Sequence, residues 1–273
     1  MKPALAQVCS LEAPLETDVE EYAAGRCQAI ELWVGKLDTY LEKHTPDEFR
    51  ALLAEYEMTA PVASFQGGLL TSQGEFRKQH WESFARRLAQ CRELAIGTLV
   101  LAADMGAPLA QQDIDRARLS LDQAAALAGQ HGVRLALEFQ ARSAFANNLE
   151  TAAALVAEVG SPHLGLCLDA FHYYVGPSKL EDLAHVTADN LFHVQLCDLA
   201  GVPRELATDA DRVLPGDGDF DLAPIVEHLR RIDYQGHVSV ELMNPQIWRI
   251  PPRSFGEIAL TALRKVLGQA SME

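Results

Sequence analysis

Short runs rich in aliphatic and β-branched residues alternate with helix-like stretches along the whole chain of 273 residues. The runs are ALAQVCS (4–10), AIELWV (29–34), TAPVASF (59–65), GTLVLAAD (97–104), RLALEF (134–139), LGLCLDAF (164–171), LFHVQLCD (191–198) and HVSVELM (237–243). The stretches between them place apolar residues three and four positions apart, as in 45–58, 76–94, 113–132 and 148–160, which is typical of amphipathic helices. Such alternation predicts parallel strands joined by right-handed helical crossovers.

Eight strand-and-helix units favour a closed (β/α)8 TIM barrel, an α/β fold. A doubly wound open sheet shows the same alternation, but it usually has fewer strands. The Gly-rich first turn of its nucleotide-binding version is missing after ALAQVCS. No low-complexity linker or shift in composition divides the chain, so residues 1–273 are expected to form a single domain.

The acidic composition argues against nucleic acids and membranes as partners. The 23 Lys and Arg residues against 38 Asp and Glu residues give a net charge of −15, which repels nucleic acids and acidic membrane surfaces. The first residues, MKPALAQVCS, contain one lysine and a short apolar run, too little for a secretory signal, and we expect a cytoplasmic protein. Five widely spaced cysteines without a CxxC pair indicate reduced, buried thiols.

Polar side chains stand at the C-terminal ends of four consecutive predicted strands, where catalytic groups of such barrels converge. They are Glu138, Asp169, Gln195 and Glu241. The residues two positions earlier share their strand parity and are expected to point into the same interior: Ala136, Cys167, His193 and Ser239. Three carboxylates brought together repel one another unless a cation neutralises them. The pattern predicts one divalent metal ion, Mn²⁺ or Mg²⁺ for oxygen ligands, with Co²⁺ or Zn²⁺ as alternatives.

This set of residues resembles the sugar phosphate isomerase/epimerase superfamily with the xylose-isomerase-like barrel, whose metal is held by Glu, Asp, His and Glu. Glu138, Asp169 and Glu241 match the carboxylates, whereas Gln195 stands where many members have the histidine. The resemblance is closer to the branch of 3-dehydroshikimate dehydratases, which also use Gln. The segment 211–222, DRVLPGDGDFDL, resembles that branch's Arg-x-x-Pro-Gly-x-Gly loop. The likeness is strongest over residues 133–245.

The resemblance implies proton abstraction next to a carbonyl, through an enediolate stabilised by the metal. Glu138 and Glu241 are the candidates for base and acid, with their order open. His172 matches the family's substrate-binding histidine, and Arg212 matches the loop arginine that holds a substrate oxygen or carboxylate.

Weaker candidates for substrate contact come from the loops after two earlier strands. Gln66 precedes a Gly-Gly turn that would allow close approach of backbone to a ligand, and Trp33 is expected to wall the pocket. Three further residues are expected to be solvated acidic loop positions: Glu205, Asp209 and Asp211.

Several functions remain open on these residues. The leading one is a metal-dependent isomerase or epimerase of a small sugar or keto-sugar. A lyase acting on a cyclic hydroxy-ketone, of the 3-dehydroshikimate dehydratase or inosose dehydratase type, is the alternative that Gln195 favours. An endonuclease IV-like enzyme would need further metal ligands and a basic DNA face, and a non-catalytic binding barrel would not need the four polar strand ends. Helices outside such barrels often pair subunits, so a homo-oligomer is compatible with the sequence.

Overall fold

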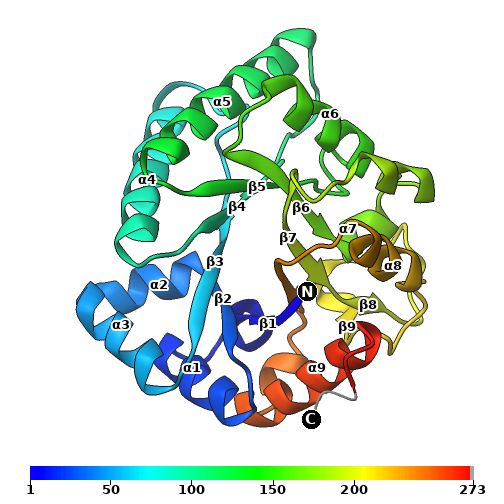
Figure 1. The fold of residues 1–273 in the computed structure, drawn as a ribbon. Coiled ribbons are helices and arrows are strands. Elements are labelled where there is room, and N and C mark those ends of the chain that lie inside the picture. The colour runs from blue at the N-terminus through cyan, green and yellow to red at the C-terminus, as the bar shows by residue number, and fades with distance from the viewer. Residues whose placement is uncertain (271–273) are drawn as a thin grey trace. The chain divides into compact units, whose positions relative to one another are not determined.

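A computed structural model describes residues 1–270 of the chain. Within these residues, eight parallel strands form a closed barrel in the order β1-β10-β7-β6-β5-β4-β3-β2 (Figure 1). Their bounds are β1 (Lys2–Ala6), β2 (Ala29–Trp33), β3 (Thr59–Gln66), β4 (Thr98–Ala102), β5 (Arg134–Glu138), β6 (Leu164–Asp169), β7 (Leu191–Leu196) and β10 (His237–Val240). This topology confirms the predicted fold class.

Helices follow the barrel strands as the alternation predicts. They are α1 (Leu15–Ala24), α2 (Val34–Leu41), α3 (Pro46–Glu55), α4 (Gly74–Glu93), α5 (Gln111–Gln130), α6 (Leu149–Val159), α7 (Ala170–Val175), α8 (Ala223–Arg231) and α9 (Pro252–Val266). Short 3₁₀ helices lie in the loops: η1 (Gln7–Ser10), η2 (Leu180–His185), η3 (Asp209–Asp211) and η4 (Ile247–Arg249). Outside the barrel, β8 (Asp198–Leu199) pairs antiparallel with β9 (Arg212–Val213).

The described chain forms two compact units, one of residues 1–61 with those from 194 onward, and one of residues 62–193. In the first unit, β1 lies between β2 and β10, with Leu5 opposite both Ile30 and Val240. Helices α1 and α9 lie side by side there (Figure 1), and the rings of Tyr22 and Phe255 meet with centroids 6.2 Å apart. Apolar side chains therefore hold the two helices together.

In the second unit, β4, β5 and β6 pair in parallel, and α5 and α6 cover their outer side (Figure 1). One buried apolar cluster takes a side chain from each strand of this part of the sheet: Val62, Val100, Ala136, Cys167 and Phe192. Because side chains alternate along a strand, Glu138 and Asp169 point to the same side as Ala136 and Cys167. Two of the predicted ligands, Glu138 and Asp169, thus lie next to this apolar cluster on the same face of their strands.

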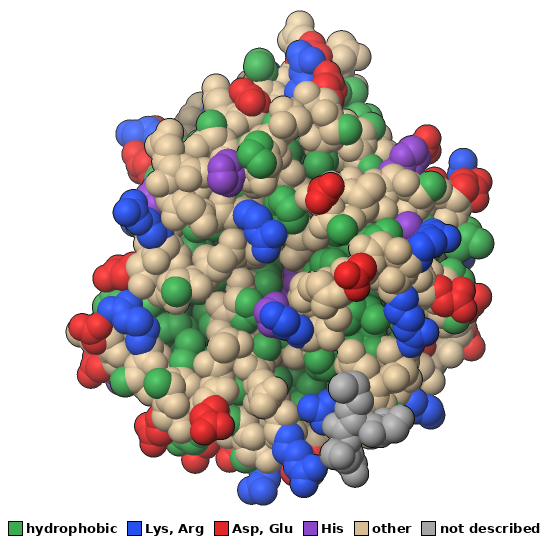
Figure 2. Space-filling view, viewed as in Figure 1, with side chains coloured by type: hydrophobic (Ala, Val, Ile, Leu, Met, Phe, Trp, Pro, Cys, Tyr) green, Lys and Arg blue, Asp and Glu red, His purple; other side chains and the backbone are tan. Residues whose placement is uncertain are grey.

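The surface and the thiols also bear on the sequence expectations. On the face drawn in Figure 2, acidic and basic side chains of the described residues are interspersed. All five cysteines are buried thiols outside any disulfide, as expected. Among residues 1–270, no helix combines the length and apolar character that crossing a membrane requires.

Candidate functional site

Two carboxylates and a histidine come together in the second unit. Glu138 ends β5, Asp169 ends β6, and His172 lies one turn into α7; all three are buried. The Nε2 atom of His172 lies 3.8 Å from Glu138 Oε1 and 3.9 Å from Asp169 Oδ2. One ligand atom from each residue falls within 4.8 Å of the other two, a spacing that a single metal ion can bridge. Two buried carboxylates at this separation repel each other unless a cation or a proton compensates their charge.

The sequence around Asp169 explains how it is fixed. Asp169 is both the last residue of β6 and the N-cap of α7, and its Oδ1 accepts a hydrogen bond of 2.6 Å from the backbone N–H of Phe171. The second carboxylate oxygen, Oδ2, is the one that faces His172. The strand therefore ends on a carboxylate because that carboxylate starts the next helix and still presents one oxygen to the cluster.

The backbone sets the tautomer of His172. The N–H of Ala141 points at Nδ1 with a separation of 3.4 Å, so Nδ1 accepts and the neutral imidazole carries its proton on Nε2. Nε2–H then faces the two carboxylates. A nitrogen that bears a proton donates hydrogen bonds and does not ligate a metal, which favours His172 as a hydrogen-bond donor beside the two carboxylates.

A second polar cluster lies in the first unit and contains the other two predicted ligands. The Nε2 group of Gln195, near the end of β7, donates to Glu241 Oε1 over 2.9 Å, and Glu241 follows β10 directly. The register of the two strands places Gln195 opposite Ser239, two residues before Glu241, so both side chains point the same way. Gln195 is 1% exposed and Glu241 is 6% exposed.

Arg212, to which the resemblance gives a substrate-binding role, is part of this cluster and is only 1% exposed. Its NH1 group donates to Glu241 Oε2 over 2.7 Å, while its Nε and NH2 groups donate to Asp209 Oδ1 over 3.1 and 2.7 Å. Two carboxylates thus surround one buried guanidinium. Asp209, which the sequence predicts to be a solvated loop residue, is half exposed and also holds the arginine.

The conformation of the glycine-rich loop explains how Arg212 is placed. The buried carboxylate of Asp198 accepts hydrogen bonds from the backbone N–H groups of Gly216 and Phe220, at 3.0 and 2.8 Å. Gly216 has a φ of +88°, and a Cβ on Gly218 would lie 2.4 Å from Asp198 Oδ1. The two glycines of the motif are therefore required by a turn and a close approach that fold the loop onto Asp198.

Glu31, in the middle of β2, belongs to the first-unit cluster although the sequence analysis does not single it out. It is 1% exposed, and its Oε1 accepts a 2.8 Å hydrogen bond from Gln195 Nε2. The signal was present in AIELWV, where one carboxylate interrupts an otherwise apolar strand. Glu31 is not a strand-end residue, because two more residues of β2 follow it.

The two weaker candidates are placed as follows. Gln66 is buried, and its amide oxygen accepts from Arg87 of α4 over 2.8 Å while its Nε2 donates to the carbonyl of Gly67. The hydrogen bonds that Gln66 makes here thus go to α4 and to the neighbouring backbone. The Gly-Gly turn after it avoids His80, since a Cβ on Gly68 would lie 2.0 Å from His80 Nδ1.

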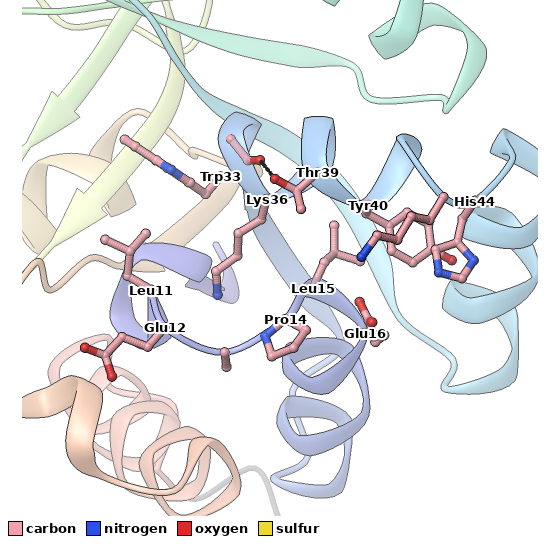
Figure 3. A pocket seen from close by; sticks show the side chains of 13 residues that line it. Leu11, Glu12, Pro14, Leu15, Glu16, Trp33, Lys36, Thr39, Tyr40 and His44 are labelled. Atoms are coloured by element: carbon pink, nitrogen blue, oxygen red, sulfur yellow. Dashed lines mark hydrogen bonds between the residues drawn. The ribbon is translucent and has the colours of Figure 1, made fainter.

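Trp33 lines a pocket of about 500 Å³ between the loop before α1 and helix α2 (Figure 3). Lys36 reaches from α2 toward that loop and donates to the carbonyl of Ser10 over 2.7 Å and to Asp18 Oδ2 over 2.6 Å. The backbone of Trp33 is held by Gln7, because its N–H donates to Gln7 Oε1 over 3.0 Å. The tryptophan thus forms part of a pocket wall within the first unit.

The chain is similar to several known proteins. A family model described as "Xylose isomerase-like TIM barrel" matches residues 21–264. An inosose isomerase of Bacillus velezensis is 28% identical over 222 residues, 79% of this chain and 78% of that protein. A 3-dehydroshikimate dehydratase of Pseudomonas aeruginosa is 26% identical over 264 residues, 94% of this chain but only 40% of the dehydratase.

Among solved structures, a crystal structure of IOLI protein with a binding zinc atom superposes with a TM-score of 0.92 at 23% identity and covers 100% of both chains. The relatives named here by their activity are enzymes, and the isomerase and dehydratase reactions both occur among them. The match over most of the chain, together with the closed barrel, shows that this chain belongs to the xylose isomerase-like TIM barrel family.

Proposed function

We propose that the protein is a divalent-metal-dependent isomerase or epimerase of a small sugar, keto-sugar or cyclic polyol ketone, and that Glu138, Asp169, Gln195 and Glu241 hold its cation. The observation that carries the proposal is the buried pair of carboxylates Glu138 and Asp169 with the His172 imidazole beside them, where one polar atom of each residue lies within 4.8 Å of the other two. Uncompensated carboxylates are costly there, so the donor set fits a cation. Oxygen ligands favour Mn²⁺ or Mg²⁺, although the zinc in the IOLI structure keeps zinc among the candidates.

The catalytic roles follow from the chemistry of the side chains. A divalent cation bound by these oxygens supplies a positive charge that polarises a substrate carbonyl. Glu138 and Glu241 then serve as the base and the acid that move a proton between adjacent carbons of the substrate. In the second unit, Nε2–H of His172 donates to a substrate oxygen. In the first unit, Arg212 orients Glu241 through its 2.7 Å ion pair.

Membership of the family supports an enzyme of this class, and the similarity to an inosose isomerase over 79% of the chain supports an isomerase. A second candidate is a lyase that removes water from a cyclic hydroxy-ketone. Gln195 favours it, because the resemblance assigns an amide ligand to the dehydratase branch, and the dehydratase match spans 94% of the chain. Both reactions begin with the same proton abstraction.

The test is deuterium exchange. Protein loaded with Mn²⁺ is incubated in D₂O with a panel of keto-sugars, inososes and 3-dehydroshikimate, and NMR follows the carbon next to the carbonyl. We expect one substrate class to take up deuterium and to isomerise, whereas loss of a hydroxyl with formation of a conjugated product would identify the lyase.

Two variants assign the proton transfers. Glu138→Gln and Glu241→Gln should each reduce exchange by about 100-fold or more, the usual effect of losing a general acid or base. Glu150→Gln, which changes an exposed glutamate of α6, is the matched control and should leave exchange unchanged. Full exchange in both active-site variants, or none with any substrate in the parent protein, would refute the proposal.

A further inference from the structure

The amide of Gln195 is held in a defined orientation. Its Nε2 group donates to two carboxylates at once, Glu31 Oε1 at 2.8 Å and Glu241 Oε1 at 2.9 Å. A primary amide has two N–H bonds, and both are directed at acceptors that have no proton to give back. Rotating the amide by half a turn would set its carbonyl oxygen against two carboxylate oxygens. The network therefore fixes which end of the amide faces the carboxylates and which end faces away.

This orientation determines what Gln195 can offer a cation. The carbonyl oxygen Oε1 is a metal ligand, whereas the protonated amide nitrogen is not. Since both N–H bonds are directed at Glu31 and Glu241, the amide of Gln195 can ligate a cation only through Oε1. Glu241 is itself a proposed ligand and acid or base, and it also carries the ion pair with Arg212. Glu31 is the acceptor that takes no other proposed part in the chemistry.

We propose that Glu31 is a positioning residue that holds the Gln195 amide so that its oxygen, and not its nitrogen, faces the cation. The inference rests on the proposed metal site and assigns a role to a residue outside the four ligands. The register supports it, because β2 pairs with β1 with Glu31 opposite Ala6, so the carboxylate comes from a barrel strand rather than a mobile loop. Its burial excludes solvent that would compete for the hydrogen bond.

The experiment compares two neutral replacements of similar size. Glu31→Gln keeps an oxygen that accepts from Gln195, and Glu31→Met keeps the volume without an acceptor. Metal-free protein is titrated with Mn²⁺, and electron paramagnetic resonance measures the free ion. We expect Glu31→Met to bind Mn²⁺ about 10- to 100-fold more weakly, the usual effect of losing a hydrogen bond to a metal ligand, and Glu31→Gln to stay within about threefold of the parent protein.

The outcomes separate this inference from the proposed function. Equal Mn²⁺ affinity in all three proteins would overturn the positioning role. Equal weakening of both variants would overturn it as well, because it would assign the effect to the lost charge. Absence of Mn²⁺ binding by the parent protein would instead contradict the proposed metal site.

A measurement on the parent protein covers the case in which Glu31→Met fails to fold. The side-chain NH₂ of Gln195 is observed by ¹⁵N NMR. Two hydrogen bonds to buried carboxylates should slow its exchange with solvent and keep its two proton signals distinct. Rapid solvent exchange at this group would show that Glu31 does not hold the amide.

Discussion

Asp18 is a buried carboxyl group in the first unit whose hydrogen bonds compensate only part of the cost of burial. It accepts from Gln7 Nε2 at 2.9 Å, from Ser10 Oγ at 2.6 Å and from Lys36 Nζ at 2.6 Å. Burial still outweighs these partners and raises the pKa of Asp18 from 3.8 to about 6. The same desolvation lowers the pKa of Lys36 from its ordinary value. The pair sits beside the pocket lined by Trp33 and ties α1 to α2.

The raised pKa predicts how stability depends on pH. Because the folded protein binds the Asp18 proton more tightly than the unfolded chain, this contribution is fully present below about pH 4 and is lost as the pH rises through about 6. The free energy of unfolding of Asp18→Asn, relative to the parent protein, should therefore rise by about 1–3 kcal/mol between pH 4 and pH 7. Urea unfolding at several pH values measures it, and parallel pH profiles for the two proteins would refute the assignment.

Gly218 offers a second test at the residue scale. A Cβ there would lie 2.4 Å from both Asp198 Oδ1 and the carbonyl oxygen of Leu199, which are parts of a hydrogen-bonded loop that has little room to move. Gly218→Ala should lower the free energy of unfolding by about 1–3 kcal/mol through overpacking. Gly106→Ala is the control, since nothing lies within 4 Å of its Cβ position, and it should change stability by less than about 0.5 kcal/mol. Equal effects in thermal unfolding would contradict the steric argument.

At the scale of elements, the loop from β8 to α8 depends on one side chain. Asp198 accepts from the backbone N–H groups of Leu199, Gly216 and Phe220, so a single carboxylate closes the turn that carries Arg212. The short pairing of β8 with β9 adds Leu199 opposite Arg212. The loop's own hydrogen bonds, together with the bond from Asn244 Nδ2 to the carbonyl of Arg212, thus place the arginine beside Glu241.

Asp198→Asn tests this dependence. The amide retains one acceptor oxygen, but its NH₂ group would face a backbone N–H, which leaves a donor unsatisfied and should cost about 1–3 kcal/mol. Hydrogen exchange should accelerate at the amides of Gly216 and Phe220. Asp217→Asn, an exposed position in the same loop, is the control and should leave both amides protected. Unchanged exchange in Asp198→Asn would remove the carboxylate from its assigned role.

The elements also show what sequence patterns can and cannot predict. Local signals were sufficient for two helix starts: the predicted stretches 45–58 and 148–160 begin at Thr45 and Asn148, and these two side chains cap α3 and α6. The first strand was predicted to reach residue 10 but ends at Ala6, because 7–10 form the 3₁₀ helix η1. That turn brings Gln7 and Ser10 to Asp18, a partner 8 to 11 residues away that an apolar run does not reveal.

The candidate site, too, has residues that the sequence predicts and residues that it does not. Strand ends and parity predicted that Glu138, Asp169, Gln195 and Glu241 hold one cation, and the resemblance added His172 and Arg212. The structure places Glu138 and Asp169 beside His172, and Gln195 and Glu241 beside Arg212. These predictions follow from the alternation of strands and helices and from the alternation of side chains along each strand, both of which are visible in the sequence. Glu31 was not predicted, because its role arises from a hydrogen bond to Gln195, 164 residues away in the sequence. Asp209 was not predicted either, although Arg212, its partner, is only three residues away. The loops decide which side chains distant in the sequence meet, and loop sequences have no regular spacing of apolar residues from which such contacts could be predicted.

For the molecule as a whole, the proposed cation would be linked to folding. The chain carries a net charge of −15, and buried carboxylates such as Asp169 add to the repulsion that the folded state must overcome. A ligand that binds the folded state and not the unfolded chain stabilises it by mass action. Metal binding should therefore appear in the stability of the entire protein and not only in its activity.

The corresponding prediction concerns removal and return of metal. At a free Mn²⁺ concentration 100 times the dissociation constant, the free energy of unfolding should exceed that of the EDTA-treated protein by about 2.7 kcal/mol. Asp169→Asn should abolish most of this increment, whereas Asp122→Asn, an exposed change on α5, should preserve it. Calorimetry with and without Mn²⁺ measures the increment. If Asp169→Asn gained as much stability from Mn²⁺ as the parent protein, the ion would be binding elsewhere, because a buried carboxylate ligand cannot be neutralised without weakening the site that it helps to form.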